Sequence, residues 1–344
     1  MKSKNSYDVV IIGAGPAGLK CAETLLKSNL SVAVFERQPA IKKACAGFYG
    51  LTSKTLKWGF PHFLFEKKFK KIVVYFKNEK VVISYPRPFV ASLNRKKLAD
   101  FQQKIIKNKE IKLFLGAAVT KITPEYIICQ NKKFYYKTLV GADGSNSLTR
   151  KFLRLKTKIG IGMQYWVAGK YFKELKIFID RSKFGPWYLW AIPHSKRISI
   201  GIGGESLNGK PAKFFVPAMK KKLQDWLQEN KINYQESSFE AAPISYFYQG
   251  FSFGNIFLVG DAAGLASKLT GEGIYFALAS GFDIAHKIIN SQYSCPNIKK
   301  VLNIKKKHHL IFWGMNHFEP VFIKLAPILL KNKLIKKLAI ELLA

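Results

Sequence analysis

Residues 7–37 read YDVVIIGAGPAGLKCAETLLKSNLSVAVFER and contain, in order, the parts of a nucleotide-binding β-α-β unit. The apolar, β-branched run Tyr7–Ile12 predicts a buried parallel strand. It leads directly into the G-x-G-x-x-G motif at residues 13–18, and a helical segment with its leucines on one face follows. A second predicted strand, at residues 30–35, ends in Glu36. This order of elements predicts a doubly wound α/β fold that binds a dinucleotide.

The glycine turn and the acid have separate tasks in such a unit. Gly13 permits the tight turn, Gly15 lets a pyrophosphate approach the backbone, and Gly18 lets the helix pack on the strand. The helix N-terminus offers N–H groups to the phosphates, and the Glu36 carboxylate can accept hydrogen bonds from adenosine ribose hydroxyls. The fingerprint alone leaves NAD and FAD open. Its candidate cofactor contacts are Gly13, Gly15, Pro16, Ala17, Gly18, Glu36 and Arg37.

Two further motifs favour FAD. L-V-G-A-D-G-S-N-S occupies residues 139–147, and N-I-F-L-V-G-D-A-A-G occupies residues 255–264, with G-E-G at residues 271–273. Together with the glycine fingerprint, these motifs resemble those of the flavoprotein hydroxylase superfamily. The resemblance implies FAD, bound by a Rossmann-like α/β domain that is discontinuous in sequence and interleaved with an antiparallel β-sheet substrate domain. It also implies cofactor contacts at Arg95, Asp143, Gly144, Gly260, Asp261, Gly271, Gly273 and Ile274.

The chemistry of these motifs agrees with the resemblance. Residues 256–259 predict a buried strand with Asp261 at its carboxyl end, where α/β sheets bind ligands, so this carboxylate can hold ribityl hydroxyls. The G-E-G turn opens a helix expected over residues 274–289. The N-terminus of that helix can stabilise negative charge on a reduced flavin ring.

A third segment narrows the branch of the superfamily. G-P-W-Y-L-W-A-I-P at residues 185–193 and G-I-G at residues 201–203 are similar to the Y-x-W-x-F-P and G-x-G motif of the geranylgeranyl reductase family, with Ile192 where Phe is usual. K-A-C-A-G at residues 43–47 is similar to its C-G-G segment, with Ala46 replacing the first glycine. The resemblance implies an FAD-dependent oxidoreductase that saturates C=C bonds of geranylgeranyl and other isoprenoid chains by hydride transfer from flavin N5.

Three residues of these segments are candidate catalytic residues. Tyr188 and Trp190 alternate on a predicted strand, so they would project from one face and wall an apolar tunnel. Cys45 is a candidate proton donor or a residue that shapes the pocket beside the flavin. Lys268 stands where family members often carry Pro; it would matter only if it faces the flavin.

Other readings stay open at this stage. A hydroxylase or epoxidase on the same fold would use O2, a flavin halogenase would share the last four positions of its W-x-W-x-I-P motif with Tyr188–Pro193, and a non-catalytic flavoprotein would keep the fold alone. Because one dinucleotide fingerprint is present, NAD(P)H would visit transiently or another electron donor would replace it. The isoprenoid or lipid acceptor itself is not identified by the sequence.

The spacing of the motifs predicts how the chain is divided. The FAD-binding domain is expected to take residues 1–65, 92–155 and 250–290, and the substrate domain residues 66–91 and 156–249. A basic helical segment is expected over residues 291–344. Within the substrate domain, residues 72–85 predict a two-stranded hairpin and residues 211–230 an amphipathic helix.

The charge of +36, from 57 Lys and Arg against 21 Asp and Glu, bears on the partners. Only seven of these cations are arginine and the lysines are spread over the chain, which indicates a compositional bias and no specific nucleic-acid partner. Residues 299–344 are different, because they combine ten lysines and two acids with leucines every four residues at Leu330, Leu334, Leu338 and Leu342. Such a segment can lie on an anionic membrane surface.

The remaining composition concerns location and metals. The four cysteines form no C-x-x-C pair and the histidines no H-E-x-x-H, so no metal site is predicted. No uncharged apolar run reaches the roughly 18 residues of a transmembrane helix, and no A-x-A cleavage site follows the N-terminal apolar run. A cytoplasmic protein is expected, with peripheral attachment to the inner face of the membrane.

Overall fold

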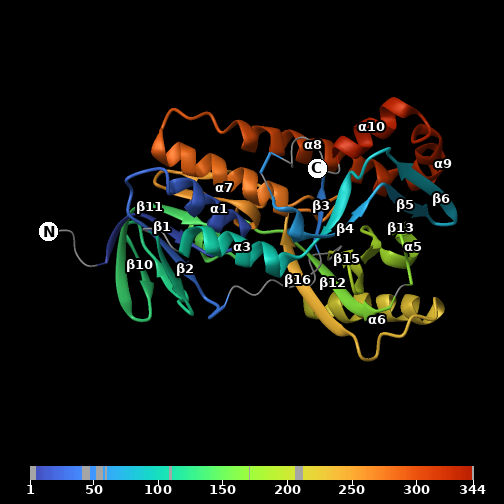
Figure 1. Cartoon of the computed structure of the whole chain (residues 1–344), viewed down its shortest axis with the longest axis horizontal. Coiled ribbons are helices and arrows are strands. Elements are labelled where there is room, and N and C mark those ends of the chain that lie inside the picture. The colour runs from blue at the N-terminus through green and yellow to red at the C-terminus, as the bar shows by residue number, and fades with distance from the viewer. Residues whose placement is uncertain are drawn as a thin grey trace.

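Two large β-sheets and a third small one, with helices packed on them, form the chain in this computed structural model (Figure 1). The structure describes residues 5–40, 47–51, 57–58, 60–107, 111–169, 171–205 and 212–342. The first sheet lies at the N-terminal end of the view in Figure 1, and the second lies at the opposite end.

The first sheet has a parallel centre made of buried apolar strands. Its strand order is β17-β18-β11-β1-β2-β8, and all neighbours run parallel except β17 and β18. Strands β10 and β9 extend antiparallel from β11. The bounds are β1 Ser6–Ile12, β2 Val32–Glu36, β8 Lys112–Leu115, β9 Val119–Ile122, β10 Tyr126–Cys129, β11 Lys132–Gly141, β17 Ser252–Phe253 and β18 Ile256–Leu258. The structure thus has the doubly wound sheet that residues 7–37 predict.

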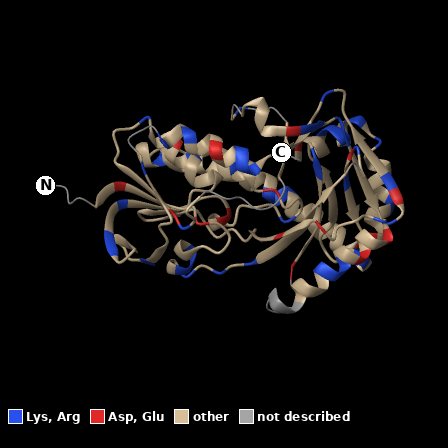
Figure 2. Cartoon of the chain, turned by 60° about the horizontal axis from the view of Figure 1, so that its bottom comes forward, with Lys and Arg blue, Asp and Glu red and all other residues tan. Residues whose placement is uncertain are grey.

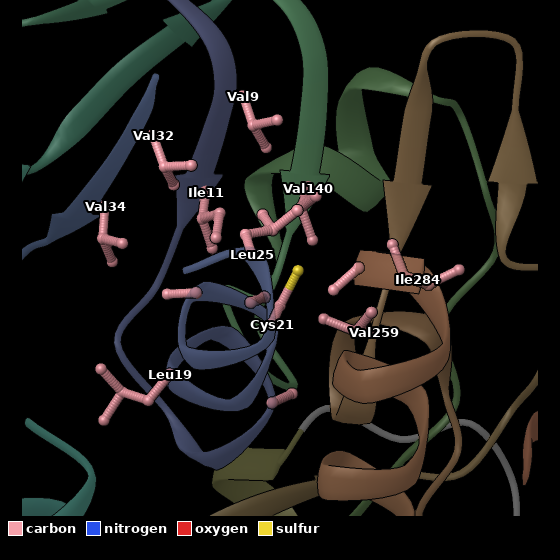
Figure 3. Close-up of a cluster of buried hydrophobic side chains, with 14 of the residues drawn as sticks. Val9, Ile11, Leu19, Cys21, Leu25, Val32, Val34, Val140, Val259 and Ile284 are labelled. Carbon is pink, nitrogen blue, oxygen red and sulfur yellow. The ribbon is translucent and has the colours of Figure 1, made fainter. Parts of the chain in front are cut away.

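Helices α1 (Pro16–Leu25) and α7 (Ile274–Ile289) pack against each other on this sheet, beside α3 (Arg95–Lys107). A methyl group at Gly281 of α7 would lie 2.2 Å from the Ala17 backbone oxygen of α1, so only glycine allows the contact. Figure 3 shows the core that strands and helices form together, with Val9, Ile11, Leu19, Cys21, Leu25, Val32, Val34, Val140, Val259 and Ile284 converging. This packing fixes the start of α7, which opens on the site described below.

The second sheet is antiparallel apart from one pair. Its order is β16-β12-β15-β14-β13-β5-β6, and only β13 and β5 run parallel. The bounds are β5 Lys71–Phe76, β6 Glu79–Ser84, β12 Ile159–Ala168, β13 Leu175–Ile179, β14 Leu189–Pro193, β15 Arg197–Gly204 and β16 Ser238–Ser245. Helix α6 (Ala212–Glu229) buries Met219, Leu223 and Trp226 on this sheet, as its amphipathic pattern predicts. The β5–β6 hairpin also joins the second sheet, as predicted.

Shorter elements connect the two sheets. A three-stranded antiparallel sheet, ordered β3-β7-β4, lies between them in Figure 1. The remaining bounds are β3 Gly47–Gly50, η1 His62–Leu64, β4 Phe65–Phe69, β7 Val90–Leu93, α4 Leu148–Phe152, α5 Arg181–Phe184 and η2 Gly260–Ala263. The first sheet takes its strands from residues 6–36, 112–141 and 252–258, and the second from 71–84 and 159–245. The fold is therefore interleaved as expected, while the domain boundaries given above stay predictions.

The basic C-terminal segment forms three helices, and its leucine repeat does not lie on one of them. Helix α8 spans Pro296–His317, α9 spans Glu319–Leu329, and α10 spans Lys333–Leu342. The expectation of one striped helix through Leu330 is wrong, because Asn332 begins a new helix. Its side-chain oxygen accepts hydrogen bonds from the backbone N–H groups of Leu334 and Ile335, at 2.9 and 3.3 Å.

The cations are distributed over both halves of the molecule, as Figure 2 shows. No single Lys- and Arg-rich face dominates that view, which agrees with the reading of the charge as a compositional bias. Across the parts of the chain that the structure describes, no helix is both long and apolar enough to cross a bilayer.

Candidate active site

A cavity of about 510 Å³ lies where the carboxyl ends of β1, β2, β11 and β18 face the second sheet. The glycine fingerprint, the Asp143 turn and the G-E-G turn line one part of it. Side chains of β12, β13, β14 and β16 line the other part, among them Ile177, Trp190 and Ile192. Segments far apart in the sequence thus form one cavity at the place where α/β sheets bind ligands.

The glycine turn at residue 13 packs closely against the backbone at residue 142. Gly13 has φ of 102°, and a methyl group there would lie 2.3 Å from the Ala142 backbone oxygen. The Glu36 carboxylate accepts hydrogen bonds from the backbone N–H groups of Ala14 at 2.9 Å and Gln38 at 3.1 Å. Each carboxylate oxygen keeps a second lone pair for a ligand hydroxyl. Of the predicted fingerprint contacts, Gly13, Gly15, Pro16, Ala17, Glu36 and Arg37 line the cavity, while Gly18 serves helix packing.

The predicted contact Asp143 uses its carboxylate inside its own turn. One oxygen accepts a hydrogen bond from the Ser147 hydroxyl at 2.6 Å, and the other accepts from the backbone N–H of Thr149 at 2.9 Å. Burial raises the pKa of this carboxyl, and these hydrogen bonds oppose the rise. Asp143 therefore shapes the turn, and Gly144, with φ of 75°, lines the cavity next to it.

Asp261 lines the cavity and lies three residues after the end of β18, within the 3₁₀ turn η2. The Ser145 hydroxyl lies 2.8 Å from Asp261 Oδ2, and a methyl group at Gly273 would lie 3.2 Å from Oδ1. Burial raises the pKa of the Asp261 carboxyl, while Ser145 and the cations of Arg95 and Lys305 lower it. The predicted contacts Arg95, Gly260, Asp261, Gly271, Gly273 and Ile274 all line this part of the cavity.

Arg150 is a buried structural link that the sequence analysis did not single out. Its guanidinium donates hydrogen bonds to the backbone oxygens of Lys156, Phe247 and Ala262, the last at 3.1 Å. Ala262 belongs to the G-D-A-A-G segment, so Arg150 ties α4 to the loop that carries Asp261. Five donors in a planar fork suit this task, and a lysine could not replace them.

We expect Arg150→Met to lower the free energy of unfolding by about 3 kcal/mol or more, because it leaves several buried carbonyl oxygens without donors. Chemical denaturation of the flavin-loaded protein measures this loss. Arg150→Lys should restore only a minor part of it. An unfolding free energy unchanged by Arg150→Met would contradict the structural role.

The candidate catalytic side chains Tyr188 and Trp190 stand side by side in the cavity wall. Their ring centroids are 6.1 Å apart with an interplanar angle of 65°. The Tyr188 hydroxyl donates a hydrogen bond to the Thr270 backbone oxygen, next to the G-E-G turn. Both side chains line the cavity wall as expected, but they do not share one strand, because Tyr188 precedes β14, which begins at Leu189.

The G-x-G motif makes room for the tryptophans of the preceding strand. A methyl group at Gly201 would lie 2.4 Å from Trp190 Cζ2, and one at Gly203 would lie 2.5 Å from Trp187 Cε3. Both indole rings therefore lie flat across β15, and Trp187 also lines the cavity. The glycines at residues 201 and 203 and the tryptophans at residues 190 and 187 therefore require each other sterically. The spacing of the motif in the sequence does not reveal this contact.

A chain of hydrogen bonds fixes the Trp190 ring from behind. Its indole N–H donates to Ser199 Oγ at 2.9 Å, and the Ser199 hydroxyl donates to Gln164 Oε1 at 2.7 Å. Gln164 Nε2 in turn donates to Glu240 Oε2 at 3.0 Å. Since Gln164 also lines the cavity, this chain sets the orientation of the wall.

We expect Gly201→Ala to lower kcat/KM by roughly ten- to a hundredfold, because the added methyl group would lie 2.4 Å from both Trp190 Cζ2 and the Met163 backbone oxygen and so displaces Trp190 and the local pairing of β12 with β15. The bound flavin should stay unchanged in amount and spectrum, since Gly201 does not line the flavin end of the cavity. Steady-state kinetics with flavin content determined on the same sample measures both. Unaltered kinetics would show that the Trp190 position is unimportant.

Glu272 is the residue of this site that the sequence analysis missed. The residue is 4% exposed and lines the cavity. Among the described residues, the one hydrogen-bond donor to its carboxylate is the backbone N–H of Gly50. Burial raises the pKa of this carboxyl well above its ordinary value. Burial also raises the pKa values of the Tyr49 and Tyr188 hydroxyls, and the nearby Glu272 carboxyl raises them further. Burial of Glu272 thus favours the uncharged form of its carboxyl.

Helix α8 braces the loop that precedes the G-E-G turn. Ser267 Oγ accepts hydrogen bonds from the backbone N–H groups of Leu269 and Thr270, so its own proton points to His308 Nδ1 at 2.8 Å. His308 Nε2 then donates to the Leu342 backbone oxygen at 2.8 Å, at the end of α10. This neutral form agrees with burial, which lowers the pKa of His308 to about 4.

The other sequence-based expectations at this site have different outcomes. Lys268 pairs with Glu205 at 2.7 Å and is not among the cavity-lining residues, so it adds no cation to the wall. Cys45 lies outside the described residues. Cys21, Cys129 and Cys295 are buried free thiols away from the cavity lining.

Comparisons with known proteins fit this geometry. The pyridine nucleotide-disulphide oxidoreductase family matches residues 7–150, and the FAD binding domain family matches residues 130–292. An uncharacterized protein of Methanosarcina barkeri is 31% identical over 309 residues, which cover 85% of this chain and 76% of that protein. The chloroplastic geranylgeranyl diphosphate reductase of Oryza sativa is 26% identical over 319 residues. The match covers 82% of this chain and 66% of the length of the rice protein, just under two thirds. The digeranylgeranylglycerophospholipid reductase of Methanocella arvoryzae is 26% identical and is covered to 76%.

Solved structures share the fold. A geranylgeranyl bacteriochlorophyll reductase-like protein of Thermoplasma acidophilum superposes with a TM-score of 0.73 at 20% identity, over 90% of this chain and 86% of that one. The p-nitrophenol 4-monooxygenase of Pseudomonas putida superposes with a TM-score of 0.76 at 13% identity, over 98% of both chains. At such identities the likeness shows a common architecture, on which both reduction and oxygenation occur.

Proposed function

Because this chain belongs to the geranylgeranyl reductase family of FAD-dependent oxidoreductases, we propose that it saturates C=C bonds of an isoprenoid chain. The observation that carries the proposal is a single cavity with a polar end at the glycine fingerprint and an apolar, aromatic end at β14. A dinucleotide fits the first end, and a hydrocarbon chain fits the second.

The residues at the polar end fit FAD. The turn at Gly13 leaves no room for a side chain, so a pyrophosphate can approach the backbone there and at the start of α1. Glu36 would hold the adenosine ribose, and Asp261 would hold ribityl hydroxyls beside Arg95. When bound and reduced, FAD supplies the hydride for the alkene carbon.

The apolar end would position the alkene and exclude water. An unconjugated C=C bond does not polarise itself, so its placement must contribute much of the rate. Tyr188 is fixed by Thr270 and Trp190 by Ser199, so both rings can hold the chain in one place. Rigid aromatic walls lose little conformational freedom when a hydrocarbon chain binds.

Glu272 would deliver the proton that completes the reduction. The alkene gains a hydride on one carbon and a proton on the other, so one carboxylic proton leaves Glu272 in each saturation and returns from solvent. Burial raises the pKa of this carboxyl, which favours the protonated form that this task requires. Cys45 stays the alternative donor, and comparing Cys45→Ala with Glu272→Gln decides between them.

The test is anaerobic. The purified flavoprotein is reduced, a geranylgeranylated lipid is added without oxygen, and the lipid is then analysed by mass spectrometry. We expect the lipid to reoxidise the flavin and to gain two hydrogen atoms for each saturated bond. If only oxygen restores the oxidised spectrum and the product gains an oxygen atom, the protein is a monooxygenase instead. NAD(P)H and a reduced electron carrier, compared as reductants, identify the electron donor.

A further inference from the structure

The C-terminal helices expose a set of large apolar side chains that no part of the chain described by the structure covers. On α9, Val321, Leu325 and Ile328 recur at helical spacing and are 54%, 47% and 62% exposed. On α10, Leu334 is 78% and Leu338 50% exposed. Leu310, Trp313, Phe318 and Leu329 add to this set of exposed apolar side chains on α8 to α10. Most of the exposed large apolar side chains of the described chain are concentrated here.

The inner faces of the same helices pack on the wall of the active-site cavity. Ala326 of α9 and Ile340 of α10 belong to one buried cluster with Phe76 and Ile83 of the β5–β6 hairpin. Figure 1 shows α9 beside these two strands. The apolar cavity-lining residues Phe48, Ile177, Trp190 and Ile192 are members of the same cluster. A continuous apolar layer therefore runs from the cavity wall to the inner side of α9 and α10.

Charge on these helices suits an anionic surface. Exposed lysines flank the apolar stripes at positions 306, 307, 324, 331, 333 and 337. The acids of this segment are Glu319 and Glu341, and Glu319 lies 3.8 Å from Lys77. Apolar side chains bordered by lysines are the pattern of helices that lie in the headgroup region of anionic bilayers.

We propose that α9 and α10 dock on an anionic lipid bilayer through these exposed apolar stripes and form the portal by which the hydrocarbon chain enters. Because Ala326 and Ile340 pack against Phe76 and Ile83 of the hairpin in this structure, α9 and α10 would have to move away from β5–β6 for the hydrocarbon chain to reach the aromatic end of the cavity. The portal rests on the proposed function, because it presupposes an isoprenoid substrate; the docking surface does not.

Docking is tested with the full-length flavoprotein and vesicles. Cosedimentation compares vesicles of phosphatidylcholine alone with vesicles that also contain phosphatidylglycerol. We expect binding to the anionic vesicles, with Ile328→Glu/Leu334→Glu weakening it by roughly tenfold or more. The matched control is Phe63→Glu, which changes a side chain of similar exposure, 56%, away from α8–α10 and should leave binding unchanged.

Two outcomes would overturn docking. Equal binding by the wild type and the double variant would remove these stripes from the interaction. A wild-type dimer that the double variant converts to a monomer, with no vesicle binding by either, would show that a second copy of the chain covers the surface. Light scattering in the absence of lipid distinguishes these cases.

The portal is tested by presenting one isoprenoid substrate in two forms. The double variant should lose activity on substrate embedded in anionic vesicles and keep it on substrate dispersed in detergent. Loss of both activities, or of neither, would contradict the portal. If the wild type binds vesicles but reduces no isoprenoid in either form, the proposed function fails while docking stands.

Discussion

Glu272→Gln is expected to lower the rate of alkene saturation by about 10²- to 10⁴-fold, the range for loss of a positioned general acid. Glutamine keeps the shape of the side chain but has no acidic proton to give. Flavin content and the rate of flavin reduction by the electron donor should stay near the wild-type values. Single-turnover reoxidation of the reduced flavin by the isoprenoid measures the affected step directly.

The pH dependence separates a catalytic role from a structural one. Because burial raises the pKa of Glu272 in the folded protein, wild-type activity should be present at low pH and fall as pH rises through that value. Glu272→Gln should lack this alkaline limb. A variant with unchanged saturation kinetics would exclude Glu272 as the donor and leave Cys45 to be tested.

The same proton affects stability with a defined sign. Above about pH 4.5 the unfolded chain releases this proton while the folded protein retains it, so the wild type loses about 1.4 kcal/mol of stability per pH unit through this group. The loss continues until pH reaches the folded-state pKa. Relative to the wild type, Glu272→Gln should gain stability as pH rises. Denaturation of both proteins between about pH 5 and about pH 7 reveals whether folded Glu272 is neutral.

Gly13→Ala is expected to abolish FAD binding almost completely. The added methyl group would lie 2.3 Å from the Ala142 backbone oxygen, and φ of 102° strains any residue other than glycine. The turn must then move away from the place where the pyrophosphate approaches. The flavin absorbance of the purified protein, relative to its protein absorbance, measures the loss.

Two further variants keep this prediction testable if Gly13→Ala folds poorly. Gly314→Ala in α8, where a methyl group would meet no atom within 4 Å, should retain full flavin content. Glu36→Gln should keep the fold and weaken FAD by roughly tenfold or more, because its NH2 group cannot accept the backbone N–H of Ala14 or Gln38 that the replaced oxygen accepts, and one ligand hydroxyl loses its acceptor as well. Full flavin content in both Gly13→Ala and Glu36→Gln would contradict the assigned cofactor site.

Much of the site can be predicted from the sequence because it depends on local backbone geometry. The steric demands of the turn at Gly13 are made within one β-α-β unit, so spacing alone predicts the turn and a bound dinucleotide. The choice of FAD comes from the resemblance of the motifs at residues 139–147 and 255–273 to those of known flavoproteins. Tyr188 and Trp190 both reach the cavity wall because they are two residues apart at the start of β14, although Tyr188 precedes the strand itself. The helix expected over residues 274–289 appears as α7 with the same bounds, because its apolar pattern is continuous.

Contacts between distant segments decide the rest. Lys268 pairs with Glu205, which lies 63 positions earlier in the chain. The break in the leucine repeat is instead a local effect, because the Asn332 side chain caps α10. The sequence shows Glu272 only as an acidic residue within a turn and gives no sign that its carboxyl is buried. Its pKa is raised only because the fold buries it beside Tyr49, Tyr188 and Tyr275, which come from separate segments of the chain.

The sequence by itself determined the nucleotide-binding unit and the order of its elements, because these depend on backbone sterics over short distances. The residues expected to hold FAD stay a prediction, which rests in part on the resemblance to known flavoproteins. The tertiary structure alone decided that the Glu272 carboxyl is buried, which glycines accommodate Trp187 and Trp190, and that the inner side of α9 and α10 continues the cavity wall. Each of these depends on desolvation or on contact between segments that are remote in the chain, and neither quantity is a property of local sequence.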